Sequence, residues 1–142
     1  MSNPSDTGSV SILLIEDDDV DIEIVIRKFR DLDVPAFFHV AKTGIEALEM
    51  LYGSDNREKI TPPPDAIILD TNMPQMDGIE FLEKLHAHSG QLGMPVFMLT
   101  GEYTTRDKLA VHNLTVTARI VKPLCDDDVL RIYSQAAGKS RR

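Results

Sequence analysis

The sequence predicts one α/β domain, in which helices cover both faces of a doubly wound sheet of five parallel strands. Five short apolar runs alternate with segments whose apolar residues recur at helical spacing. Strict alternation of strand and helix favours parallel strands joined by right-handed crossovers. The runs are apolar almost throughout, which is typical of strands that are buried on both faces.

The first strand is expected at Val10–Ile15, which is an unbroken run apart from one serine. It leads into a helix near Val20–Leu32, because apolar residues recur there on one helical face. Those residues are Ile22, Val25, Ile26, Phe29 and Leu32. Asp17, Asp18 and Asp19 come just before this helix, where one of them can cap its first turn and all complement its dipole.

The second strand is expected at Ala36–Val40, directly after a proline. Thr43 and Gly44 then start a helix, and Gly53 ends it. The apolar residues of this helix are Ile45, Leu48, Met50 and Leu51. A polar loop rich in proline follows.

The remaining strands and helices follow the same alternation. The third strand is Ala66–Leu69, and its helix spans Gly78–His88 with Ile79, Leu82 and Leu85 facing inward. The other expected strands are Met94–Leu99 and Thr117–Val121, and the other expected helices are Thr104–Asn113 and Asp126–Ala137.

Size and charge limit the class of protein. With 142 residues, the chain is long enough to form one hydrophobic core. Its net charge of −8 argues against nucleic-acid binding, because phosphate contacts need clustered basic residues. Residues 1–9 and 138–142 are expected to be flexible tails around a domain at 10–137. One cysteine, no long apolar stretch and no secretory pattern predict a cytoplasmic protein without a membrane span.

Polar residues end four of the five apolar runs. They are Glu16 and Asp17 after the first strand, Asp70 after the third, Thr100 after the fourth and Lys122 after the fifth. Carboxyl ends of parallel strands meet at one edge of a sheet, where doubly wound folds bind ligands. We therefore expect these side chains to form one site.

The charges at this edge predict a divalent cation. Glu16, Asp17 and Asp70 contribute three negative charges and Lys122 one positive charge. Two carboxylates about 4 Å apart repel by roughly 4 kcal/mol at an effective dielectric constant of 20. Oxygen ligands favour Mg²⁺, or Mn²⁺, over zinc. Such a site suits phosphoryl transfer, with the Asp70 carboxylate as a nucleophile that forms an acyl phosphate.

Four motifs carry a resemblance to a known family. They are Leu14-Ile15-Glu16-Asp17, Ile68-Leu69-Asp70 with Met73-Pro74 and Asp77-Gly78, Met98-Leu99-Thr100, and Val121-Lys122-Pro123. In this order and at strand ends, they resemble the receiver domain of two-component response regulators over residues 12–137. The resemblance implies a flavodoxin-like sheet of order 2-1-3-4-5 with five helices.

The resemblance also implies a role for each residue of the site. Asp70 corresponds to the phosphoryl acceptor, Thr100 to the hydroxyl that moves to the phosphoryl oxygen, and Lys122 to the cation that pairs with it. The Lys122-Pro123 bond is expected to be cis. Asp17 corresponds to a direct Mg²⁺ ligand and Glu16 to one that acts through water.

The resemblance also implies roles for residues around the site. At one of these positions the residue differs from those usual in the family. The backbone carbonyl of Asn72 corresponds to a metal ligand, and Asn72 and Glu102 hold positions that tune hydrolysis of the acyl phosphate. Arg119 stands where the family has Tyr, Phe or His, and burying a guanidinium is costly. We expect Arg119 to stay outward and to form an ion pair across an interface, and Tyr103 in the neighbouring loop to supply a substitute aromatic ring.

The resemblance implies a single-domain phospho-acceptor switch that catalyses only its own phosphorylation and dephosphorylation. Its donor is a sensor histidine kinase or a histidine phosphotransfer protein, and the fourth helix, fifth strand and fifth helix are expected to bind an unidentified target or a second copy. The loop Ser54–Pro64 and Leu114-Thr115-Val116 resemble regulators of bacterial phytochromes, with chemotaxis-type regulators as the nearest alternative. Partner choice rests on the first helix, from Asp21 to Lys28.

Two alternatives belong to other classes. A haloacid-dehalogenase-like phosphohydrolase also uses an Asp at a strand end, but it has a second Asp where this chain has Asn72, and it carries a cap insertion. A receiver-like binding module without phosphorylation is the other alternative. The intact set of Glu16, Asp17, Asp70, Thr100 and Lys122 argues against it.

Overall fold

The computed structural model describes residues 8–70, 78–88, 93–100 and 116–140. The strands are β1 (Val10–Ile15), β2 (Ala36–Ala41), β3 (Ala66–Asp70), β4 (Val96–Thr100) and β5 (Ala118–Val121). The helices in these ranges are α1 (Asp19–Asp31), α2 (Gly44–Tyr52), α3 (Gly78–Ala87) and α5 (Asp126–Ser140). The helix expected at Thr104–Asn113 lies outside the described residues.

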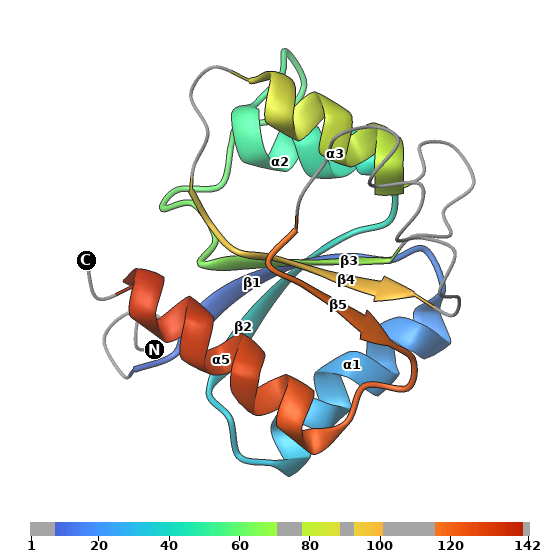
Figure 1. Cartoon of the computed structure of the whole chain (residues 1–142). Coiled ribbons are helices and arrows are strands. Elements are labelled where there is room, and N and C mark those ends of the chain that lie inside the picture. The colour runs from blue at the N-terminus through green and yellow to red at the C-terminus, as the bar shows by residue number, and fades with distance from the viewer. Residues whose placement is uncertain (1–7, 71–77, 89–92, 101–115, 141–142) are drawn as a thin grey trace.

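The five strands form one parallel sheet of order β2-β1-β3-β4-β5, which confirms the predicted fold (Figure 1). From β1 the chain runs outward to the edge strand β2 and then crosses to the other side of β1. The register pairs Ile15 with Leu69 and Asp70 with Leu99. The carboxyl ends of these strands therefore lie at one level of the sheet.

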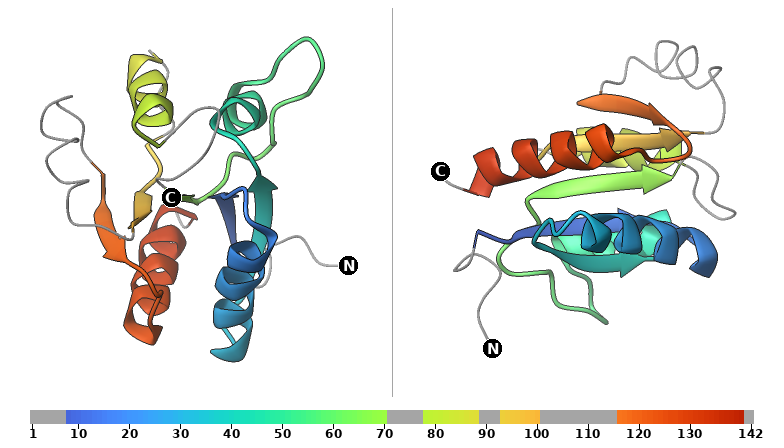
Figure 2. Two further views of the ribbon diagram at one scale, coloured as in Figure 1. Left: turned by 90° about the vertical axis from the view of Figure 1, so that its right-hand side faces the viewer. Right: turned by 90° about the horizontal axis from the view of Figure 1, so that it is seen from below.

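Helices cover both faces of the sheet. Helices α1 and α5 lie side by side on one face, and α2 and α3 lie on the other (Figures 1 and 2). Strand β1, which lies between β2 and β3, contributes to both apolar cores: Ile12 and Leu14 pack toward α1 and α5, and Leu13 and Ile15 toward α2 and α3. Burial on two faces explains why the strands contain so few polar residues.

Capping residues fix where two helices begin. Asp18 is the N-cap of α1, and its carboxylate accepts hydrogen bonds from the backbone N–H groups of Val20 and Asp21, at 2.8 and 3.2 Å. Thr43 caps α2 and accepts from the N–H of Glu46 at 3.0 Å. These bonds satisfy donors that have no partner inside the helix.

Some boundaries and exposures differ from the sequence-based expectation. Helix α5 continues to Ser140 rather than ending at Ala137, and β2 includes Ala41. Ile45 belongs to the apolar pattern of α2 but is exposed, because the helix packs mainly through Ala47 and Leu51. Helical periodicity alone does not show how wide a strip of the helix the sheet covers.

The segment between α2 and β3 projects from the body of the domain (Figure 2). Its start is tied to α2, because the guanidinium of Arg57 pairs with the carboxylate of Glu46 at 3.1 Å. The N–H of Ile60 donates to the carbonyl of Met50 at 2.7 Å. In the described part of the chain, no helix is both long enough and apolar enough to span a bilayer.

Candidate functional site

The polar residues that end the strands gather at the carboxyl edge of the sheet. Asp70 and Thr100 are the last residues of adjacent strands, β3 and β4, and both are buried. Glu16 directly follows β1 and is also buried, with 1% of its surface exposed. Lys122 directly follows β5, and its N–H donates to the carbonyl of Thr100 at 2.9 Å. Topology thus assembles residues that are far apart in the sequence.

Three acidic side chains form the floor of this site. Glu16, Asp17 and Asp70 each offer a carboxylate oxygen, and these atoms lie within 4.8 Å of one another. Among the described residues, Oε1 of Glu16 is buried and has no hydrogen-bond partner. Since an unpartnered buried carboxylate oxygen is costly, this atom fits a cation ligand, directly or through water. An all-oxygen donor set suits Mg²⁺ or Mn²⁺.

Burial, followed by the neighbouring carboxylate of Asp70, raises the pKa of Glu16 from 4.5 to about 8. The N–H of Asp18 donates to Oε2 of Glu16 at 3.3 Å, and this bond only partly offsets the rise. Without a bound cation, the negative charge of Glu16 at this edge of the sheet is therefore energetically unfavourable.

Lys122 lies among three carboxylates. Its Nζ is 3.3 Å from Oδ1 of Asp70, 3.7 Å from Oδ2 of Asp21 and 4.0 Å from Oε1 of Glu16. Burial lowers the pKa of Lys122, but the charges of Asp70, Glu16 and Asp21 outweigh burial and hold it above its ordinary value. The bond between Lys122 and Pro123 is cis, as expected.

The sequence analysis missed the place of Asp21 in this group. It treated Asp21 only as the start of the segment that selects partners. A signal was nonetheless present, because an acid in the first turn of a helix that follows Asp17 lies near the same edge of the sheet. Which cation it meets depends on where the Lys122 side chain, which extends from the end of β5, brings its ammonium group.

Of the other predicted site residues, the structure describes only Arg119. Asn72, Glu102 and Tyr103 lie outside the described residues. Arg119 is exposed, between the buried residues Ala118 and Ile120 of β5, and its guanidinium is therefore outward rather than in the core. The outward position is the one expected for Arg119, whereas the ion pair across an interface stays a prediction. Its signalling role stays a prediction.

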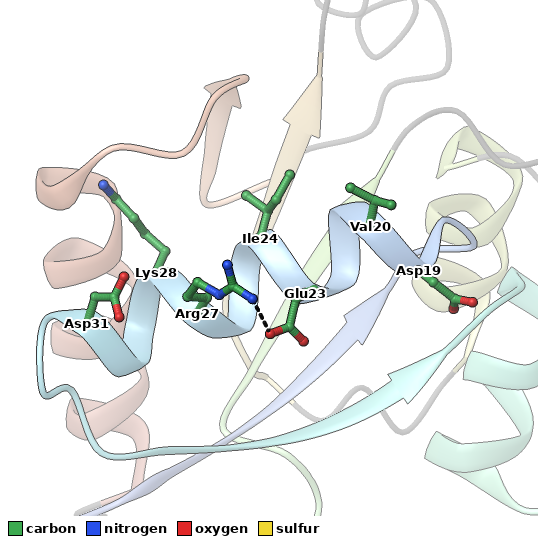
Figure 3. A pocket seen from close by; sticks show the side chains of 7 residues that line it. All are labelled: Asp19, Val20, Glu23, Ile24, Arg27, Lys28 and Asp31. Carbon is green, nitrogen blue, oxygen red and sulfur yellow. Dashed lines mark hydrogen bonds and ion pairs between the residues drawn. The ribbon is translucent and has the colours of Figure 1, made fainter.

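A shallow groove runs along the outer face of α1, beside the site (Figure 3). Val20 and Ile24 are 67% and 51% exposed in it, which is unusual for large apolar side chains on one helix. Charged residues surround them, namely Asp19, Glu23, Arg27, Lys28 and Asp31. Arg27 and Glu23 pair at 3.1 Å. The groove thus has an apolar centre and a rim of both charges.

Comparison with known proteins gives a consistent result. Residues 12–134 match the family model described as response regulator receiver domain. Response regulator Rcp1 from Synechocystis is 29% identical over 86% of this chain and 82% of its own length. A structure of its Mn²⁺-bound form has a TM-score of 0.69 at 26% identity, covering 91% of this chain and 90% of the other.

Two further structures and one kinase extend the comparison. A two-component response regulator from Legionella pneumophila has a TM-score of 0.79 at 40% identity, covering 91% of this chain and 98% of the other. The bacteriophytochrome response regulator AtBRR has a TM-score of 0.76 at 28% identity, covering 91% of this chain and 92% of the other. The sensor histidine kinase CheAY from Helicobacter pylori is 31% identical over 86% of this chain, which spans only 14% of that kinase.

Proposed function

This chain belongs to the family of response regulator receiver domains, and we propose that Asp70 is the residue through which it acts as a phospho-acceptor switch. The observation that carries this assignment is the position of Asp70, at the end of β3 between the carboxylates of Glu16 and Asp17 and the ammonium of Lys122. A nucleophile in this position has both a cluster of acids able to hold a cation and an ammonium group close by.

The proposed reaction moves a phosphoryl group from a phosphohistidine to Asp70. A carboxylate oxygen of Asp70 attacks phosphorus, the P–N bond breaks, the imidazole leaves and takes a proton, and an acyl phosphate remains. Lys122, 3.3 Å from Oδ1 of Asp70, supplies positive charge where the phosphoryl oxygens come to lie. The domain is proposed to catalyse only its own phosphorylation and dephosphorylation.

A divalent cation completes the proposed site. Glu16, Asp17, Asp70 and the backbone carbonyl of Asn72 are the proposed residues that hold Mg²⁺, or Mn²⁺ as in the Mn²⁺-bound Rcp1 structure. When bound, the cation offsets negative charge on the acidic edge and on the incoming phosphoryl group. The buried Oε1 of Glu16, which has no hydrogen-bond partner among the described residues, supports this assignment.

The proposed output starts at Thr100 and Lys122. Phosphorylation adds charge and strong acceptor oxygens at Asp70, to which the Thr100 hydroxyl and the Lys122 ammonium are drawn. Both residues adjoin β5, whose exposed Arg119 lies on the surface proposed to bind a target or a second copy. Asn72 and Glu102 are proposed to tune the lifetime of the acyl phosphate, and Tyr103 to provide a substitute ring.

The proposed donor is a sensor histidine kinase or a histidine phosphotransfer protein that docks on α1. Support comes from the exposed Val20 and Ile24 at the centre of the α1 groove (Figure 3). The similarity to AtBRR makes a kinase of the bacterial phytochrome type the proposed partner. The phosphohydrolase alternative is not favoured, since the family match and the fold are those of a receiver domain.

Acetyl phosphate with Mg²⁺, followed by mass spectrometry of the intact protein, tests the assignment. The unaltered chain is expected to gain one phosphoryl group, and Asp70→Asn none. Asp33→Asn is the matched control, because Asp33 is exposed and has a positive φ of 55° that asparagine also tolerates. Label that persists on Asp70→Asn would place the acceptor elsewhere.

A further inference from the structure

We propose that Asp21 is a positioning residue that holds the Lys122 ammonium at the rim of the site and competes for it with a phosphoryl group on Asp70. This inference rests on the proposed function, because it concerns the same lysine and the same acceptor. It adds a residue from α1 to a site that is otherwise built from strand ends.

The ammonium of Lys122 lies between a buried carboxylate and an exposed one. Its distances to Oδ1 of Asp70 and Oδ2 of Asp21 are 3.3 and 3.7 Å. The side chain of Asp70 is 4% exposed and that of Asp21 41% exposed. The lysine is therefore shared between the reacting centre and the surface.

The backbone of Asp21 is held in place by the helix cap. Oδ1 of Asp18 accepts hydrogen bonds from the N–H groups of both Val20 and Asp21, at 2.8 and 3.2 Å. The cap thus fixes the first turn of α1, on which Asp21 lies within reach of the Lys122 ammonium. Asp21 consequently holds its negative charge at a fixed place near Lys122.

Competition follows from the shared ammonium. A phosphoryl group on Asp70 brings negative charge into a buried environment, where attraction to Lys122 is strong. An ammonium that approaches the phosphoryl oxygens more closely must give up part of its contact with Asp21. Removal of the Asp21 charge should therefore strengthen binding of a phosphoryl group or of its mimics.

Beryllofluoride, with Mg²⁺ present, provides a stable probe whose affinity ¹⁹F NMR measures. We expect Asp21→Asn to bind it about two- to fivefold more tightly than the unaltered protein, as suits the loss of one exposed ion pair. Asp21→Glu, which keeps the charge, should bind it as the unaltered protein does. Equal affinity of the unaltered protein and Asp21→Asn would overturn the proposal.

Asp19→Asn is the matched control. It removes the same charge from the same helical turn, but Asp19 pairs with Lys42 instead of Lys122. Its beryllofluoride affinity should stay close to that of the unaltered protein. An equal gain in Asp19→Asn and Asp21→Asn would show a general effect of charge and overturn the proposal.

A double-mutant cycle separates competition for Lys122 from direct repulsion of the anion. In a Lys122→Met background, Asp21→Asn should produce no further gain in beryllofluoride affinity, because the shared ammonium is absent. The same gain in both backgrounds would mean that Asp21 acts directly on the anion, and the role assigned to it would be wrong.

The contact can also be tested without any phosphoryl chemistry. The ¹³Cε and ¹⁵Nζ resonances of Lys122 should move in Asp21→Asn and stay in place in Asp19→Asn. Unmoved Lys122 resonances in Asp21→Asn would overturn the inference, whatever the protein does with phosphate. If they move but the unaltered protein binds no beryllofluoride, the proposed function fails, and the competition proposed here fails with it.

Discussion

The ammonium of Lys122 lies 3.3 Å from Oδ1 of Asp70, although Lys122 follows β5, Asp70 ends β3, and β4 separates these two strands in the sheet. The long lysine side chain reaches across the end of β4 to the carboxylate. Its positive charge offsets part of the repulsion among Glu16, Asp17 and Asp70. Stability and chemistry at this edge therefore depend on the same few charges.

Lys122→Ala should destabilise the protein by about 1 kcal/mol in the absence of divalent cations, because acids at the edge lose a partner. Lys122 is partly exposed, so the cost is smaller than that of breaking a fully buried pair. Urea unfolding in a chelating buffer measures this difference. Equal midpoints for Lys122→Ala and the unaltered chain would contradict the prediction.

Mg²⁺ should raise the melting temperature of the unaltered protein. A ligand that binds only the folded state contributes about 2.7 kcal/mol at a hundredfold excess over its dissociation constant. Asp17→Asn should weaken this effect, whereas Asp33→Asn, far from the acidic floor in sequence and exposed, should retain it. Differential scanning calorimetry with and without Mg²⁺ measures the shifts, and an undiminished shift in Asp17→Asn would exclude this residue as a ligand.

His39 should make the stability of the protein depend on pH. Burial lowers the pKa of His39 below its ordinary value of 6.5, so the unfolded chain binds the proton more tightly. The stabilising contribution of neutral His39 is complete above pH 6.5 and is lost as the pH falls through the lower pKa of the folded state.

His39→Gln removes this titration. As the pH falls from 7.5 toward 5.5, the free energy of unfolding of the unaltered protein should fall more than that of His39→Gln. The stability advantage of the unaltered protein should therefore become smaller. His39 also contacts the ring of Phe37, with 4.9 Å between the centroids, so a loss that is independent of pH is expected as well. Urea unfolding at several pH values separates the two parts, and a difference that does not vary with pH would contradict the prediction.

Thr43→Ala should cost about 1 kcal/mol of stability, because the N–H of Glu46 loses its acceptor at the start of α2. Thr43→Ser keeps the hydroxyl and should recover most of the loss. Thermal unfolding of the three proteins tests this, and equal losses for Ala and Ser would mean that the methyl group, not the cap, matters.

Arg119→Ala should leave labelling by acetyl phosphate intact and weaken association that depends on phosphorylation. The reason is that Arg119 is exposed on β5, two strands away from β3, which carries Asp70. Size-exclusion chromatography with light scattering, after beryllofluoride treatment, measures self-association. Arg27→Ala on α1 is the control. Unchanged association and unchanged target binding in Arg119→Ala would end the signalling role assigned to this residue.

The sequence by itself determined the strands, the sheet edge and the three acids of the floor. Apolar runs that end in Glu16, Asp70, Thr100 and Lys122 suffice for this, because the carboxyl ends of parallel strands share one edge. Helix starts were also accessible, since Asp18 and Thr43 act within a few residues of themselves.

Only the tertiary structure decided how far burial extends and which charges meet. Ile45 is exposed because the sheet covers a narrower strip of α2 than the apolar pattern covers. Asp21 meets Lys122 because the lysine side chain extends from the end of β5 toward the first turn of α1. Local patterns follow from the chemistry of neighbouring residues, whereas contacts between distant elements depend on where side-chain packing places each helix against the sheet.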